Sequence, residues 1–407
     1  MKLKSLLLSA VLLVSLPLVA DEAKVITEKA IEAAAVQTPQ EPQQQPETEP
    51  GSDEVQPGTA TTPSADETNG RLDGFGEAIT EVRNSLENLN RMRISGYIQP
   101  QYVHDERSRN ELGGTSGTRN LDQFSVRRAR VKFTYQFSPT SRFVLQPDVT
   151  SSGVTLKDGY VEFTEPWTAW KNTLTAGQFN WPFGFEIMYS SSAREMPERS
   201  RVIRTLFPGE RDRGVMLSGL GFGERFRYQV AVVNGTGTSR ADDVNKRKDV
   251  VGRVGYSLGA FDIGASLYRG ADIVATSTVA TGVEFDKQRQ GIDFQWATPV
   301  PGLGVRGEYI SGKQAPGANT TRTESFDVDG WYFYAIQNLG TRHQLVARID
   351  EYDPNTDANN DAVRTIGGSY IFHWDANSKV MLAYEMPENE ANDPDDNVFT
   401  LRYQYSF

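Results

Sequence analysis

The sequence predicts an all-β fold, a transmembrane antiparallel up-and-down β-barrel of about 16 strands. Three observations predict it: a C-terminal strand with two different faces, a period-two hydrophobic pattern from Ile94 onward, and connections that are short at one rim only. In residues 399–407 the aromatic and aliphatic side chains occupy every second position and end at Phe407. Because a strand changes face at every residue, one face is apolar and the other is wet. Soluble sandwiches also contain such strands, but the aromatic weighting favours a barrel in lipid.

Each further strand is predicted from the same alternation, which gives sixteen strand-like runs. Their approximate spans are 94–104, 122–137, 141–151, 154–165, 171–179, 212–219, 225–234, 248–257, 261–270, 288–297, 303–311, 326–337, 342–352, 363–374, 378–387 and 396–407. The connections at one rim are short throughout, as in 138–140, 258–260 and 375–377. Most of the connections at the other rim are long and polar. An even strand number with this asymmetry is typical of a bacterial outer-membrane barrel, whose lumen should hold water.

The residues before the barrel divide into three predicted parts. Residues 1–20 combine a basic start with a short apolar run and are expected to be a secretory signal peptide, since the run is short for a retained anchor helix. Residues 21–70 are acidic and rich in Pro and Gln, which predicts a disordered spacer. Residues 71–93 carry apolar side chains at spacings of three and four, which predicts a short coiled-coil helix. The alternative is that this helix packs on the mouth of the barrel that residues 94–407 of the same chain form.

The longest predicted connection, 180–212, is the first functional candidate. It contains aromatic residues followed by an arginine-rich stretch, and connections this long are usually functional or disordered. Folded inward, it would narrow the pore and focus a positive potential there. The constriction arginines are then Arg194, Arg199, Arg201 and Arg204. An outward loop whose arginines pair with Glu195, Glu198 and Glu210 is the alternative.

Three segments carry a family resemblance. Residues 126–133 (VRRARVKF), 177–186 (GQFNWPFGFE) and 210–215 (ERDRGV) resemble signature segments of the phosphate-selective porin family of Gram-negative outer membranes. The resemblance spans residues 94–407. It implies sixteen-stranded trimeric channels with an inward-folded third loop. It also implies a ladder of arginines along the wall.

The alternation supplies the residues of a candidate anion path. In the second predicted strand, Ala129, Val131 and Phe133 form the lipid face, and a charge on that face at mid-depth would cost ~2–4 kcal/mol. The basic residues between them therefore face the lumen. The same alternation in the other strands places further basic side chains in the lumen. The full candidate anion path is Arg128, Arg130, Lys132, Arg142, Arg227, Arg306 and Arg348. Guanidinium groups suit phosphate or carboxylate because they donate two hydrogen bonds in a plane. Pairing with luminal acids is the open alternative, and the acids are Asp148, Asp158, Glu162, Glu308 and Asp350.

Charge and the remaining residue types limit the function further. From residue 94 onward there are 34 basic and 38 acidic residues, so net charge does not decide selectivity. Lysine is sparse in the barrel, which favours anions in general over phosphate alone. The three histidines are far apart, and residues 353–361 resemble a calcium loop that lacks its glycine and its final glutamate. We therefore expect no enzyme, no cofactor and no metal site.

The sequence predicts an outer-membrane porin that passes small hydrophilic solutes and favours anions such as phosphate. A non-selective diffusion porin is the nearest alternative, a structural tether between outer membrane and cell wall is the rival from another class, and an outer-membrane hydrolase is a distant third. The expected partners are two further copies of the chain, lipopolysaccharide and outer-membrane lipid, and the barrel-assembly machinery through the Phe407 strand. The spacer in the periplasm suggests peptidoglycan as a further partner, and no nucleic acid is expected.

Overall fold

The computed structural model describes residues 80–81, 90–106, 122–151, 153–238, 242–243, 245–275, 282–317, 324–390 and 397–407. The predicted signal peptide, the predicted spacer and most of the predicted helix lie outside these residues. The described part forms sixteen strands and a short helix, α3 (Arg201–Leu206). The strands are β1 (Met92–Asp105), β2 (Gln123–Ser138), β3 (Ser141–Thr150), β4 (Gly153–Thr164), β5 (Thr173–Asn180), β6 (Arg211–Gly221), β7 (Phe226–Val233), β8 (Asp249–Leu258), β9 (Phe261–Val274), β10 (Val283–Ala297), β11 (Leu303–Gln314), β12 (Phe326–Leu339), β13 (His343–Asp353), β14 (Val363–His373), β15 (Ser378–Asn389) and β16 (Val398–Ser406).

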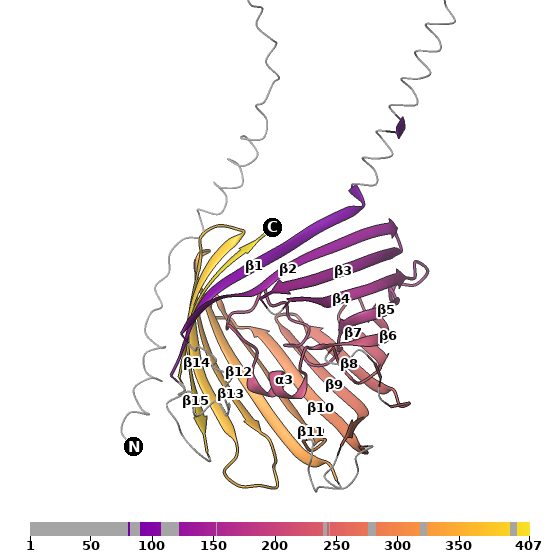
Figure 1. Ribbon diagram of the computed structural model, residues 1–407. Helices are drawn as coiled ribbons and strands as arrows, with labels where there is room; N and C mark the ends of the chain where they lie inside the picture. The colour runs from indigo at the N-terminus through magenta and orange to yellow at the C-terminus, as the bar shows by residue number, and fades with distance from the viewer. Residues whose placement is uncertain are drawn as a thin grey trace, which may run out of the picture. The chain divides into compact units, whose positions relative to one another are not determined.

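The sixteen strands form one closed antiparallel barrel (Figure 1). Each strand pairs with its neighbours in sequence, and β1 closes the ring by pairing with β16. At the seam, Gly96 and Phe407 exchange two backbone hydrogen bonds of 2.9 and 3.0 Å. A closed ring leaves no strand edge unpaired, as a barrel in lipid requires. The predicted fold class is therefore confirmed.

The strand boundaries follow the predicted spans closely, with two informative differences. Strand β1 begins at Met92, two residues before the predicted start. Strand β10 begins at Val283, five residues earlier than predicted, because its pairing with β9 continues through Asp286 opposite Ala271. Polar outward residues such as Asp286 interrupt the apolar alternation, although the backbone ladder continues past them. Hydrophobic periodicity therefore ends before the hydrogen-bonded strand does.

The two faces of the wall differ as the alternation predicts. In β16, Thr400, Arg402 and Gln404 face inward and are 3–6% exposed. The side chains between them face outward and are about 40% exposed, for example Leu401 and Tyr403. The outer face of the described strands is largely aliphatic between its rims, and aromatic side chains gather toward the rim with short connections, where one of the two aromatic girdles of a membrane barrel lies. None of the described helical residues belongs to a helix with the length and apolarity needed to cross a membrane.

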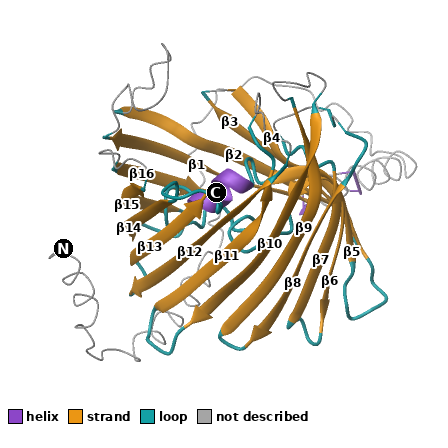
Figure 2. Cartoon of the chain, turned by 90° about the horizontal axis from the view of Figure 1, so that it is seen from below, coloured by secondary structure: helices purple, strands orange, loops and turns teal. Residues whose placement is uncertain are grey.

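The connections have the predicted asymmetry, with two exceptions. The short connections include 139–140, 259–260 and 374–377, and the left-handed backbone of Gly259 (φ 66°) makes one of these turns possible. On the opposite rim the connections are longer, apart from residues 151–152 between β3 and β4, and on the short rim residues 165–172 between β4 and β5 are as long as some of these. The longest connection with a described course runs from 181 to 210 and carries α3. It lies within the ring of strands (Figure 2).

Candidate functional site

The connection between β5 and β6, residues 181–210, crosses the lumen, and we call it the inner loop. Its backbone contacts strands on the opposite wall: the carbonyl of Ser192 accepts a hydrogen bond of 3.0 Å from Gln404 Nε2, and the carbonyl of Pro197 accepts one of 2.6 Å from Arg402 Nη1. On the other side, the amide of Gly184 donates to Ser266 Oγ in β9 at 2.9 Å. Because β9 and β16 lie far apart in the ring, the loop spans the interior.

Apolar residues explain why the inner loop folds inward. Seven of its apolar side chains are at most 3% exposed: Phe183, Ile187, Met196, Val202, Ile203, Leu206 and Phe207. They pack in one cluster with inward-facing wall residues, among them Val251, Tyr268 and Tyr332. Burying one such side chain contributes roughly 1.5–3 kcal/mol. Without the loop these wall residues would face water, so the two surfaces stabilise each other.

Glycine and buried carboxylates fix the two ends of the loop. Gly184 adopts φ 56°, and a Cβ there would lie 1.7 Å from Glu308 Oε1, so only glycine fits. This carboxylate accepts hydrogen bonds from the amides of Phe185 and Glu186 at 3.2 and 3.4 Å. The amide of Arg201, at the start of α3, donates to Asp350 Oδ1 at 3.0 Å. Acids on the wall therefore hold backbone donors of the loop, as expected for the N-terminal end of a helix.

Of the four predicted constriction arginines, two are buried inside the loop. Arg199 donates to the carbonyls of Glu186, Ile187 and Tyr189 at 2.8–3.1 Å and pairs with Glu210. Arg194 is 3% exposed, and its guanidinium has no hydrogen-bond partner within the described residues.

The other two predicted constriction arginines, Arg201 and Arg204, lie in α3. Arg201 is half-buried and Arg204 is exposed. The structure therefore places all four arginines in the inner loop. Their contact with a solute remains a prediction.

The seven residues of the predicted anion path all face inward, but six of them pair with acids. The pairs are Arg128–Glu198, Arg130–Asp148, Arg142–Glu162, Arg227–Asp262, Arg306–Glu195 and Arg348–Asp350. Three of these acids were expected from the alternation, whereas Glu195 and Glu198 come from the inner loop. Lys132 has no acid partner among the described residues. The wall is therefore one of mixed charge.

Several basic residues of the lumen were not among the predicted set. Arg253 pairs with Asp293 at 2.6 Å, and Arg289 is 2% exposed beside Phe207. Lys379 donates to the carbonyl of Ser192 at 2.7 Å. The phase of the alternation identifies Arg253 and Arg289 as inward, because both neighbours of each point outward. The contacts of Arg289 and Lys379 with the inner loop could not be predicted from that pattern.

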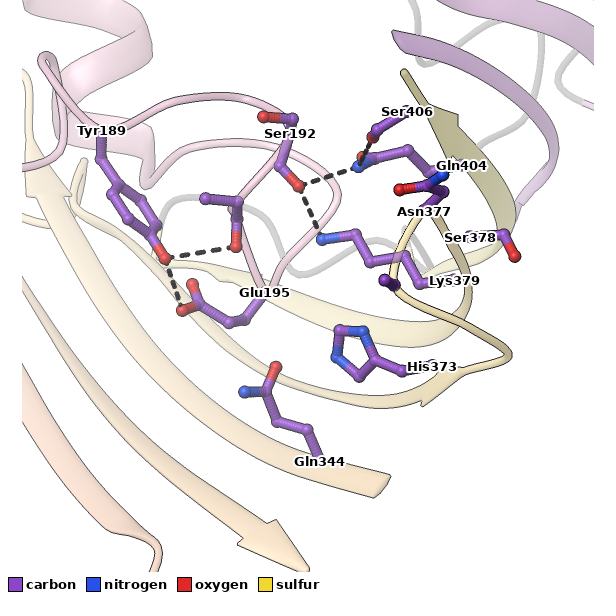
Figure 3. A pocket seen from close by; sticks show the side chains of 12 residues that line it. Tyr189, Ser192, Glu195, Gln344, His373, Asn377, Ser378, Lys379, Gln404 and Ser406 are labelled. Atoms are coloured by element: carbon purple, nitrogen blue, oxygen red, sulfur yellow. Dashed lines mark hydrogen bonds between the residues drawn. The ribbon is translucent and has the colours of Figure 1, made fainter. Parts of the chain in front are cut away.

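Three cavities meet at Tyr189, on the side of the inner loop that faces the short connections, and we call them the Tyr189 cavities. Their volumes are about 350, 370 and 390 Å³. Figure 3 shows the first, where the Tyr189 hydroxyl donates to Glu195 Oε1 at 2.8 Å and Lys379 reaches across from β15. The basic residues that line the three are Arg130, Lys132, Arg199, Arg211, Arg227, Arg253 and Lys379, and the acidic ones are Asp158, Glu195 and Asp262. Five of the seven cations are paired with acids, and the two lysines, Lys132 and Lys379, have no acid partner within the described residues.

The family comparison agrees with this geometry. The family model of phosphate-selective porin O and P matches residues 103–258, from β1 through the inner loop to β8. The resemblance predicted from the sequence is confirmed over this segment, and the fold indicates a protein of Gram-negative outer membranes. No curated relative matches the chain.

Solved structures show the same fold. An anion-selective porin from Comamonas acidovorans aligns with a TM-score of 0.57 at 12% identity, covering 78% of this chain and 99% of that chain. OmpT of Vibrio cholerae, in its trimer form, aligns with a TM-score of 0.55 at 11% identity over 78% and 99% of the two chains. The outer-membrane channel DcaP of Acinetobacter baumannii gives 0.54 at 11% identity over 78% and 97%. At these identities the likeness is one of fold.

Proposed function

We propose that this porin lets small hydrophilic solutes diffuse across the outer membrane and that it favours anions, phosphate among them. The excess of positive charge from Lys132 and Lys379, which line the Tyr189 cavities without an acid partner in the described residues, carries the proposal. In a narrow passage with low-dielectric walls, such an excess raises the local concentration of anions. Passage requires weak binding and fast exit, so no reaction takes part. The anion selectivity of the porin from Comamonas acidovorans supports the same function.

A non-selective diffusion porin is the second candidate. The pairing of six candidate-path arginines with acids favours it, because a paired guanidinium presents little net charge to a passing ion. The two candidates differ in the sign of a measurable quantity. An anion-favouring channel develops a reversal potential in a potassium chloride gradient, whereas a non-selective channel develops almost none.

Reversal potentials in planar bilayers test the proposal. We expect chloride to be favoured over potassium, and we expect Lys132→Gln to reduce this preference, because Lys132 lines a Tyr189 cavity without an acid partner in the described part. Adding phosphate at fixed chloride should reduce the chloride current if phosphate enters the same path. Lys171→Gln, which removes a side chain paired with Glu224 in the connections between strands, is the control. A preference for potassium would overturn the anion proposal.

Assembly and topology form a second part of the proposal. The trimer form of OmpT supports a trimer here, with the long connections outside the cell and residues 21–91 in the periplasm. Residues 1–20 are then removed as a signal peptide. The predicted helix, which ends before β1 begins at Met92, forms a coiled coil between subunits, and the spacer reaches toward peptidoglycan. The outer face contacts lipopolysaccharide and lipid, and the Phe407 strand is presented to the barrel-assembly machinery.

Deleting residues 71–91 tests the coiled coil and leaves β1, which begins at Met92, intact. The trimer should then dissociate at lower temperature or at lower detergent concentration, because three helices would no longer join the subunits. Native gels over a temperature series measure this. Deletion of residues 40–60, within the spacer, is a control of similar length that should leave the trimer unchanged. If the unaltered protein and both deletion variants dissociated at the same temperature, the helix would have no role in joining the subunits.

A further inference from the structure

A fourth cavity lies on the side of the inner loop that faces the long connections, apart from the Tyr189 cavities. Its volume is about 250 Å³, and its lining includes Trp181, Phe207, Thr236, Tyr268, Lys287 and Arg289. We call it the Trp181 cavity. The two ends of the inner loop, the turn after β7 and the ends of β9, β10 and β11 enclose it. Its size is below the usual range for drug-sized ligands, so it suits a smaller molecule.

Three buried polar atoms of this cavity have no hydrogen-bond partner among the described residues. They are Trp181 Nε1, Thr236 Oγ1 and Arg289 Nε. Buried donors are nearly always paired in folded proteins, because leaving one unpaired costs about 1–3 kcal/mol. Two of the three can only donate, so the missing partner is an acceptor.

Arg289 also lacks a direct ion pair. Its guanidinium donates to the amide oxygen of Gln314, and no carboxylate of the described part of the chain is in contact with it, although Asp272 lines the same cavity and pairs with Lys287. The neighbouring Lys287 is different, since its ammonium lies 3.3 Å from carboxylates of both Asp249 and Asp272. A buried charge without a counter-ion is unfavourable. The acceptor that fits best is therefore an anion placed against Arg289.

One part of the cavity wall is aromatic and apolar, beside polar side chains that include Thr236, Asp272, Lys287 and Gln314. The rings of Trp181 and Phe207 lie 5.6 Å apart, and Arg289 lies over Phe207 and Tyr268 at 5.0 and 5.4 Å from the ring centroids. Ile273 adds aliphatic surface. The aromatic part offers no hydrogen bonds to a small inorganic anion, but it suits a flat or apolar molecular body.

We propose that the Trp181 cavity binds a small organic carboxylate with a flat apolar body. The carboxylate lies against Arg289 and the Trp181 N–H, and the body packs on the rings of Trp181 and Phe207. The proposal rests on the proposed function, because it treats the cavity as a transient binding site for anions that enter the lumen from the rim with the long connections. It adds a class of solute beyond phosphate.

Benzoate is the probe that tests it, with the full-length protein in planar bilayers and in detergent. Benzoate should reduce the chloride current saturably and change the fluorescence of Trp181. Acetate lacks the apolar body and benzyl alcohol lacks the charge, so each should act only at a concentration about tenfold or more higher. Arg289→Gln should raise the half-blocking concentration of benzoate about tenfold, and Trp181→Phe should abolish the fluorescence change. Arg269→Gln, on the outer face of β9, is the control.

The outcomes separate this proposal from the proposed function. If benzoate acts no more strongly than acetate, or acts equally on the Arg289→Gln protein, only water occupies the cavity and the proposal is overturned, while an anion-favouring reversal potential still supports the proposed function. If the channel favours potassium but benzoate still changes Trp181 fluorescence, the site stands and the proposed function fails. Heat-dependent gel migration shows which variants form the barrel, and Trp181→Phe tests the site if Arg289→Gln does not fold.

Discussion

Replacing Arg199 with alanine is expected to release the inner loop and to give a channel with larger and noisier current. Arg199 donates to the carbonyls of Glu186, Ile187 and Tyr189 and pairs with Glu210, so one side chain holds both limbs of the loop. Removing one partner of a buried ion pair costs about 3–5 kcal/mol, because the other charge is left uncompensated. Single-channel conductance and current noise measure the effect.

Arg204→Ala is the matched control for this prediction. It removes the same charge from the same loop, but Arg204 is exposed in α3. Its current noise should equal that of the unaltered protein. If the Arg199→Ala channel were as quiet as the control, the apolar contacts of the loop alone would hold it in place, and Arg199 would not be the side chain that joins its two limbs.

The same contact sets the pH dependence of the loop. Although burial opposes its ionisation, the guanidinium groups of Arg199, Arg194 and Arg211 lower the pKa of Glu210 to about 2. A lowered pKa contributes stability that is complete above the ordinary glutamate value of ~4.3 and is lost as the pH falls toward the folded value. This carboxylate should therefore stay ionised and keep the inner loop in place even at acidic pH. Without Arg199 the pKa of Glu210 should be higher. As the pH is lowered, extra current noise should therefore appear at a higher pH in the Arg199→Ala protein than in the unaltered protein.

The fold could be predicted from the sequence because each strand meets two solvents. Alternation of apolar and polar side chains is a local property, and it identified all sixteen strands and the inward phase of residues such as Arg130 and Arg348. Strand ends were less predictable where the backbone hydrogen bonds between strands continue beyond the apolar part of the outer face, as at Asp286. There the backbone stays paired although the outward side chains become polar.

The candidate site was predicted only in part, because its energetics depend on contacts between distant segments. The sequence identified the inner loop and its arginines, but not that Arg199 is used within the loop or that Glu198 pairs with Arg128 and Arg402 on the wall. The Trp181 cavity was not predictable, because Trp181, Thr236 and Arg289 belong to three separate connections or strands. Only the folded barrel brings them together.

The second large effect concerns the outer face, where Val230→Arg is expected to destabilise the barrel by about 2–4 kcal/mol. Val230 is 48% exposed on the outside of β7, and Leu217 and Gly252 lie beside it on the neighbouring strands. Apolar residues lie above and below it on the same face, so a guanidinium there would be placed in hydrocarbon. Urea titration of folding into lipid vesicles measures the loss of stability.

Gln295→Arg is the control, because it introduces the same charge on the inner face of β10, where Gln295 lines one of the Tyr189 cavities. Water in the lumen solvates that charge, so its folding midpoint should stay close to that of the unaltered protein. The sign of the difference depends only on which face meets lipid. If the two variants lost equal stability, or if Gln295→Arg lost more, the outer face of β7 would not lie in a membrane, and the passage through the barrel would need another explanation.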